Sequence, residues 1–226
     1  MILFLHEKGK NYAVNSDSLA KQLLANGYTI LLGDLPDIGE MGPGYMRGDT
    51  YINNVSYNKW FAGILTGKSI VGLRAEDIIR MTHFIKNNLA DYDSISAIST
   101  GVLGSELLHA AVFENDIQKV CLIRPFLSYS EITLSQEYKP SFIHSTVAGA
   151  IEEYDLPDLI ASLCPRKALI INPLSANGGK ADETKSKQNL LFPFKVYSEK
   201  NAINNVKLES NIDDHLILEH VLSWLR

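Results

Sequence analysis

The 226-residue chain has only two cysteines and no basic surplus, since its formal net charge is −5 and its pI is about 5.7. Cys121 and Cys164 lie in apolar segments far apart, which predicts neither a disulfide framework nor a thiolate metal site. We therefore expect no metal and no cofactor. The acidic balance argues against a nucleic-acid partner or an anionic membrane surface.

Long apolar runs are also lacking. None reaches the ~18 residues that a membrane-spanning helix needs, so we expect no membrane partner. The start, MILFLHEKGK, is too short for a signal peptide and has no small-residue cleavage site. The chain as given is expected to be cytoplasmic, or exported if a leader was removed, and the sequence leaves this open. Its length and its 46% hydrophobic content suit one α/β domain over residues 1–226.

Continuous apolar segments alternate with amphipathic ones along the chain. Helical patterns include one after a predicted N-cap at Ser16, one over 68–89, one over 102–113 and a closing one over 213–226. Such alternation predicts a mostly parallel sheet between two helix layers, a three-layer α/β/α sandwich. Ligands then bind beyond the carboxyl ends of the strands. The strands are expected over 2–6, 28–34, 95–98, 118–123, 167–172 and 205–210.

Four segments at these strand ends and in the intervening helices carry recognisable motifs: HEKGK (6–10), GDLPDIGEMGPGY (33–45), LTGKSIVGLRAEDIIRMTHFI (65–85) and YDLPDLIASLCPRKALIINP (154–173). Together they resemble the α/β-hydrolase fold, and most closely its acetyl-xylan-esterase-like branch of bacterial carbohydrate esterases. The resemblance implies a serine esterase whose oxyanion loop would include Gly9 and Val102. The match starts at the family's third strand. The first two strands are therefore expected to be absent, and the chain to correspond to the C-terminal part of a longer architecture.

The segment 94–113, SISAISTGVLGSELLHAAVF, occupies the place of the nucleophile elbow, G-x-S-x-G. One register makes Ser99 the nucleophile, and the other puts Gly101 at the tip. Counting back from Gly101 places apolar residues where the family strand has them, whereas counting back from Ser99 gives two polar mismatches. The second register also aligns Ala110 and Ala111 with the family's small pair. We therefore expect Gly101 at the nucleophile position, and Ser99 stays as the alternative.

The rest of a catalytic triad is incomplete in the sequence. The acid should follow the strand KALIIN, but 174–179 contains no carboxylate, and Ser175 occupies the expected region. Asp182, the nearest acid, is better explained as a helix cap. His215, after the last strand, is well placed for a base. His144 lies in a variable region over 124–164 and could line a cleft.

Two functions follow from these residues. The first is a hydrolase related to carbohydrate esterases, with impaired or lost serine chemistry, which would use Ser99 or an unrecognised nucleophile with His215. The second is a non-catalytic binding or scaffold module that keeps the hydrolase pocket. We expect a small-molecule or carbohydrate ligand, and a sheet edge left by the absent strands would favour a homodimer. An aromatic set beside the glycine-rich loop suits sugar stacking and equally suits packing: Tyr45, Tyr51, Tyr57, Trp60 and Phe61.

Overall fold

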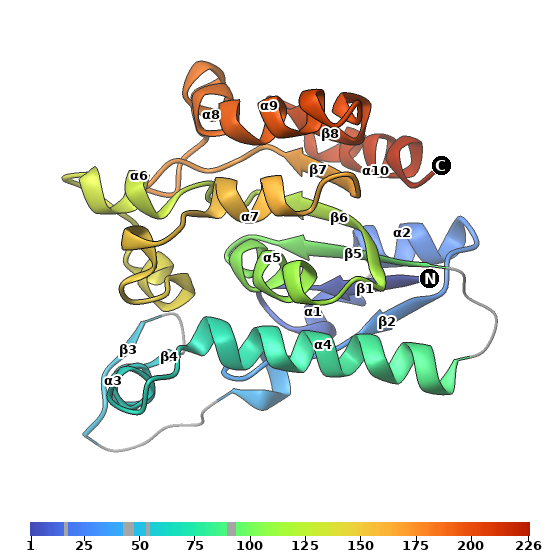
Figure 1. Cartoon of the computed structure of the whole chain (residues 1–226). Coiled ribbons are helices and arrows are strands. Elements are labelled where there is room, and N and C mark those ends of the chain that lie inside the picture. Colours follow the sequence, from blue (N-terminus) through green and yellow to red (C-terminus); the bar gives the residue numbers. More distant parts are fainter. Residues whose placement is uncertain (16–17, 43–47, 53–54, 90–93) are drawn as a thin grey trace.

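The computed structural model describes residues 1–15, 18–42, 48–52, 55–89 and 94–226. Its centre is a six-stranded, wholly parallel sheet in the order β2-β1-β5-β6-β7-β8 (Figure 1). All six predicted strands are confirmed. Their bounds are β1 Ile2–Leu5, β2 Ile30–Leu32, β5 Ile95–Thr100, β6 Ile117–Ile123, β7 Lys167–Ile171 and β8 Val206–Glu209.

Helices cover both faces of this sheet (Figure 1). On one face lie α4 (Ile70–Asn88), α5 (Leu103–Phe113), α7 (Leu156–Ser162) and α9 (Leu191–Glu199), and on the other α2 (Leu19–Ala25) and α10 (Ile217–Leu225). The pleat of β1 divides its side chains between them: Leu3 and Leu5 join the α4/α5 core, whereas Ile2 and Phe4 join the α2/α10 core. The predicted α/β/α sandwich is confirmed, with the architecture of an α/β-hydrolase.

Shorter elements lie at the carboxyl end of the sheet and on the outer surface. They are α1 (Lys10–Ala13), η1 (Gly39–Met41), β3 (Tyr51–Ile52), β4 (Val55–Ser56), α3 (Tyr57–Leu65), α6 (Tyr129–Leu134), η2 (Pro140–Ser145), η3 (Ala150–Glu152), α8 (Glu183–Asn189), η4 (Ile203–Asn205) and η5 (Asp214–Leu216). The strands β3 and β4 form a separate antiparallel pair.

Three local details complete the description of the helices. The predicted cap Ser16 lies outside the described residues, and α2 begins after Ser18, whose hydroxyl accepts a hydrogen bond from the Lys21 N–H. The helices α8 and α9 meet at Leu190, and Pro193 lies in the first turn of α9, where no partner is needed for its missing N–H. The helix α3 is not among the elements predicted from the sequence.

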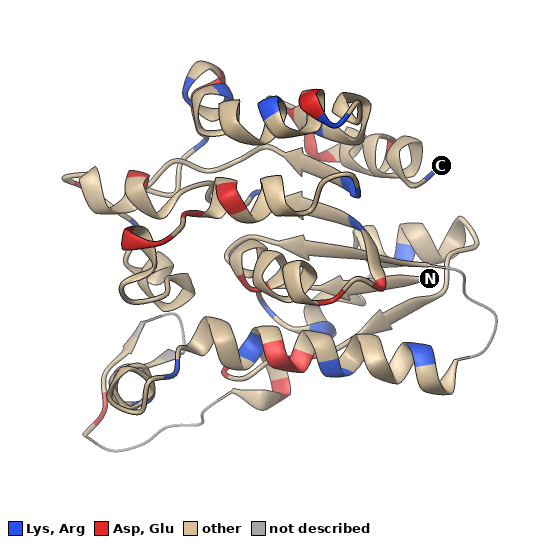
Figure 2. Cartoon of the chain, viewed as in Figure 1, with Lys and Arg blue, Asp and Glu red and all other residues tan. Residues whose placement is uncertain are grey.

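Charges of both signs are spread over the outer helices and loops (Figure 2). In the part of the chain that the structure describes, no helix has both the length and the apolar character to cross a bilayer. Within the same residues, no cluster of three or more histidine, cysteine or acidic side chains could hold a metal ion.

Candidate functional site

The sharp turn between β5 and α5 has the geometry of a nucleophile elbow. Its left-handed residue is Gly101, with φ of 60°, and the Gly101 N–H donates to the Ile123 carbonyl at 2.8 Å. Ser99 lies two residues earlier, inside β5, in register with Leu5 and Leu122 of the neighbouring strands. The structure therefore places glycine, not serine, at the tip.

The side chain of Ser99 is fully buried in the sheet. Its Oγ makes no hydrogen bond with any residue that the structure describes. His215 is exposed on η5, and among the described residues no hydrogen bond links it to Ser99. Ser99 Oγ is thus buried, without a hydrogen bond to a base among the described residues.

The space in front of the elbow is filled by a residue that the sequence analysis did not single out. A Cβ added at Gly101 would lie 1.9 Å from Glu7 Oε2 and 2.4 Å from Glu7 Cδ. The backbone of Glu7 is held there because its N–H donates to Thr100 Oγ1 at 3.2 Å. A carboxylate thus stands where the side chain of a nucleophile would project. The one signal for it in the sequence is its place in the loop after β1.

The two expected oxyanion donors differ in availability. Gly9, with φ of 88°, already donates its N–H to the His6 carbonyl at 2.8 Å. The N–H of Val102, at the start of α5, donates to no acceptor among the described residues. Only Val102 therefore offers a free donor, at the positive end of a helix dipole.

The expected acid region forms a closed turn. Ser175 Oγ donates to Asn177 Oδ1 at 2.7 Å, and the Ser175 N–H donates to the Gly179 carbonyl at 2.9 Å. Asp182 caps α8 by accepting from the Lys185 N–H at 3.1 Å. Within the described chain, no hydrogen bond or ion pair links Ser175 or Asp182 to His215.

The loop that carries His215 is anchored at both sides. Asn172, with φ of 50°, exchanges two hydrogen bonds with the backbone of Ile212, at 2.6 and 2.8 Å. Arg124, with φ of 56°, makes an ion pair with Asp214. These contacts fix the loop beside the carboxyl ends of β6 and β7.

A cavity of about 330 Å³ opens at the carboxyl ends of β1, β5 and β6, on the α2/α10 side. Its polar lining includes His6, Thr100, Arg124 and Asp214. His6, Thr100 and Asp214 directly precede Glu7, Gly101 and His215 in the chain. Burial lowers the pKa of His6, with the nearby Glu7 opposing that shift. This volume lies within the range of small-molecule sites.

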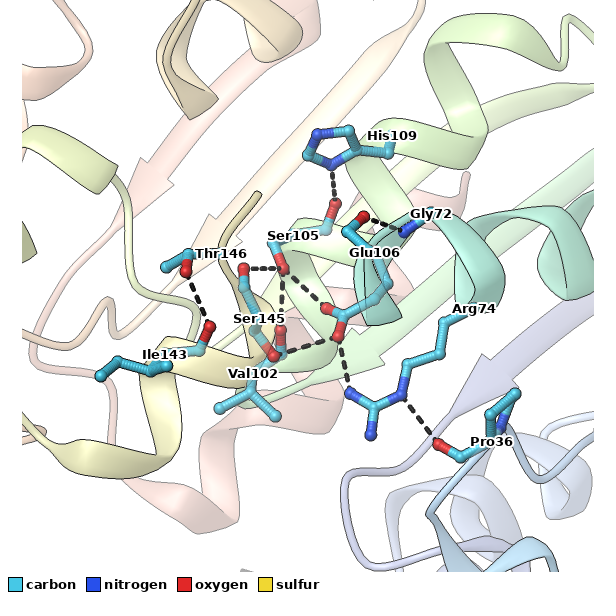
Figure 3. A network of polar contacts seen from close by, with 11 residues as sticks. Pro36, Gly72, Arg74, Val102, Ser105, Glu106, His109, Ile143, Ser145 and Thr146 are labelled. Carbon is cyan, nitrogen blue, oxygen red and sulfur yellow. Dashed lines mark hydrogen bonds and ion pairs between the residues drawn. The ribbon is translucent and has the colours of Figure 1, made fainter. Parts of the chain in front are cut away.

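Behind the elbow, a buried polar network ties four segments together (Figure 3). Arg74 of α4 forms an ion pair with Glu106 of α5 at 2.8 Å, and both side chains are almost fully buried. Arg74 Nε donates to the Pro36 carbonyl at 2.9 Å, and Ser145 Oγ donates to Glu106 Oε1 at 3.0 Å. Ser105 Oγ lies 2.7 Å from Glu106 Oε2. The network fixes η2 and the loop after β2 against the first turns of α5.

No protein-family model matches the chain, and no curated protein sequence does. Solved structures do resemble it, at identities that establish the fold alone. A candidate acetyl xylan esterase from Bacteroides fragilis has a TM-score of 0.76 at 15% identity, covering 100% of this chain and 70% of that one. A carbohydrate esterase family 15 glucuronoyl esterase from Caldicellulosiruptor kristjansonii gives 0.64 at 14%, covering 99% and 66%. A Pyrococcus furiosus esterase gives 0.56 at 14%, covering 99% and 77%. The chain thus has an esterase-like α/β-hydrolase fold.

Proposed function

We propose that this chain is a ligand-binding module on an α/β-hydrolase fold that has lost serine-type ester hydrolysis. The observation that supports it is the elbow itself, where Gly101 has no side chain and Glu7 occupies the space in front of it. A triad acts as a unit, and loss of its serine removes most of the rate acceleration. Burial of Ser99 and the closed turn at Ser175 point the same way.

What remains is a pocket rather than a catalytic centre. The cavity beside the elbow has polar groups at its strand ends and apolar side chains from α2 and α10. Structural neighbours include esterases that act on carbohydrates by name, so a small molecule or a carbohydrate is the ligand class to test first. Binding should raise the melting temperature, because a ligand at 100 times its Kd adds about 2.7 kcal/mol to stability.

The decisive experiment is an ester-hydrolysis assay with p-nitrophenyl acetate. We expect no turnover above that of a matched protein blank, together with stabilisation by at least one member of a glycan panel. Turnover that Ser99→Ala and His215→Ala each abolish would overturn the proposal in favour of a serine esterase. A flat melting temperature across the panel would also count against it.

A second candidate function rests on the same carboxylate. Glu7 could act as a general base: it would take a proton from a water that attacks the ester carbonyl, and Val102 N–H would stabilise the oxyanion. Collapse of the tetrahedral intermediate would break the C–O bond, and the alcohol would recover the proton from Glu7. This candidate predicts turnover that survives Ser99→Ala but falls about 10²- to 10⁴-fold in Glu7→Gln.

A further inference from the structure

The imidazole of His144, in η2, is the unsatisfied polar group that stands out in the interior. The residue is only 2% exposed, and neither Nδ1 nor Nε2 has a hydrogen-bond partner among the described residues. His109 shows the usual arrangement, since its two ring nitrogens contact the Ser105 carbonyl and the Tyr154 hydroxyl, both at 2.7 Å. A buried donor and acceptor left without partners lower stability, so such a group needs an explanation, and a bound ligand is one.

Aromatic rings from α3 enclose this imidazole. The Tyr57 ring lies 5.9 Å from the His144 ring at 79°, and the Trp60 ring lies 6.1 Å from it at 86°. Burial, and then the positive charge of Arg74, lower the pKa of His144, with Asp37 opposing. The ring is therefore neutral at pH 7, with one nitrogen as donor and the other as acceptor.

The charges around the ring cancel in pairs. Arg74 is paired with Glu106 at 2.8 Å, and Asp37 is paired with Lys59 at 2.6 Å. No cation is left over among these four to attract an anionic ligand, and no acid is left over to attract a cationic one. The surroundings therefore favour a neutral ligand.

The helix that covers His144 is weakly held. None of the α3 side chains is buried, and Phe61 and Leu65 are 52% and 85% exposed. Its ion pair to the body of the protein joins Lys59, which is half exposed, to Asp37, which is only 3% exposed, so breaking the pair would leave a buried carboxylate without a partner. Access of a ligand to the imidazole therefore requires a shift of α3 that keeps Lys59 beside Asp37.

We propose that His144 is the hydrogen-bonding centre of a site for a neutral polyhydroxylated ring, which α3 covers when no ligand is bound. A hydroxyl group both donates and accepts, so it satisfies a neutral imidazole that needs a partner of each kind. Tyr57 and Trp60 provide apolar ring surface for the C–H faces of such a ligand. The proposal rests on the chain being a ligand-binding module, and it locates a site distinct from the cavity beside the elbow.

The test uses methyl β-D-glucopyranoside and methyl β-D-xylopyranoside as probes, with sodium D-glucuronate as the charged counterpart. We expect a saturable change in the fluorescence of the half-buried Trp60 and a shift of the His144 ring signals in NMR spectra. Glucuronate should bind at least about tenfold more weakly than the glucoside, since its carboxylate finds no free cation.

Variants separate a ligand role from a packing role. His144→Phe keeps a ring in place and removes both nitrogens, so we expect an unchanged or higher melting temperature with loss of binding. Trp60→Leu, on a helix that buries no side chain, should also lose binding and stay folded. Leu65→Ala, at the exposed end of the same helix, is the matched control and should bind as the wild type does.

Two results would overturn this proposal. One is the absence of any pyranoside-dependent shift of the His144 signals in the wild-type chain. The other is unchanged binding in both His144→Phe and Trp60→Leu. Ser99-dependent ester turnover, by contrast, would refute the proposed function and leave a measured His144 response intact, so the two failures are distinguishable.

Discussion

The carboxylate of Glu7 lies where a side chain at residue 101 would begin. The loop after β1 and the turn after β5 bring them together, and a Cβ at 101 would come within 1.9 Å of Glu7 Oε2. Any residue other than glycine at 101 must both accept φ of 60° and displace this carboxylate. The identity of residue 101 and the position of Glu7 are thus coupled.

Restoring a serine at the elbow should therefore destabilise the fold. Gly101→Ser is expected to lower the free energy of unfolding by about 1–3 kcal/mol because of the left-handed backbone, and the exposed Glu7 side chain can turn aside at little further cost. Urea denaturation measures this. Gly27→Ser is the matched control, because Gly27 also has φ near 87° but nothing within 4 Å of an added Cβ.

The double variant Glu7→Ala/Gly101→Ser tests whether the carboxylate moves freely. It should be about as stable as Gly101→Ser, and both should lose about as much as Gly27→Ser. A loss in Gly101→Ser well above that in Gly27→Ser, with recovery in the double variant, would mean that Glu7 is held firmly in front of the elbow.

The buried pair Arg74–Glu106 gives a second prediction. Glu106→Leu should lower the free energy of unfolding by about 3–5 kcal/mol, because it leaves the Arg74 guanidinium unpaired in the interior. The double variant Arg74→Met/Glu106→Leu should be far less destabilised, since no lone charge remains. Glu76→Ala, which breaks an exposed pair with Arg80, should cost no more than about 1 kcal/mol. A Glu106→Leu loss as small as that of Glu76→Ala would refute the argument.

The sheet could be predicted from the sequence because strands buried on both faces give continuous apolar runs. The register at the elbow could also be predicted from the sequence. Apolar residues precede Gly101 at the positions that the family strand requires, whereas polar residues fall at two of those positions before Ser99. The helix α3 was not predicted, and none of its side chains is buried in the core. Tyr45 of the aromatic set lies outside the described residues. Tyr57 and Trp60 of that set pack on His144.

The site was harder to predict than the fold because its contacts join segments far apart in the chain. Glu7 meets the elbow across 94 positions, and nothing in HEKGK indicates which way its carboxylate points. Arg74 lay within a motif that the sequence analysis used, but its partner was not identified. The signal was present, since Glu106 is the one acidic residue in the mostly apolar helix LGSELLHAAVF and so needs a partner when buried.

Stability should fall as the pH falls through the range where free histidine titrates. Burial lowers the pKa of His6, His109 and His144 below the ordinary histidine value, so these rings stay neutral in the folded chain while the unfolded chain takes up protons. The unfolded state then binds more protons, and the free energy of unfolding decreases with decreasing pH.

Urea denaturation at pH 7.5 and pH 5.5 measures this dependence. The loss of stability between these two pH values should shrink in His144→Phe, which removes one of the three groups. Between pH 7.5 and 8.5 these rings should contribute no change, because they are neutral in both states. A free energy of unfolding that rises toward pH 5.5 would contradict the prediction.

Asp155 is expected to be the most sensitive helix cap in the chain. Its carboxylate accepts from Ser128 Oγ and from the N–H groups of Tyr129, Ser130 and Leu156, at 2.6 to 3.1 Å. Burial opposes its ionisation, but these hydrogen bonds outweigh burial and lower the pKa of Asp155 below 3.8. Asp155→Asn turns one acceptor oxygen into a donor that faces other donors, so it should lower the free energy of unfolding by about 2 kcal/mol at pH 7.

Asp182→Asn is the matched control, since the Asp182 side chain caps α8 by accepting from the Lys185 N–H, and this variant should lose about 0.5 kcal/mol or less. The Asp155 contribution is present above pH 3.8 and is lost as the pH falls toward the lower folded-state pKa, where the carboxylate becomes protonated. The gap between wild type and Asp155→Asn in urea denaturation should therefore narrow below that pH. A gap at pH 7 no larger than that of Asp182→Asn would show that the four hydrogen bonds at Asp155 do not stabilise the segment joining β6 to α7.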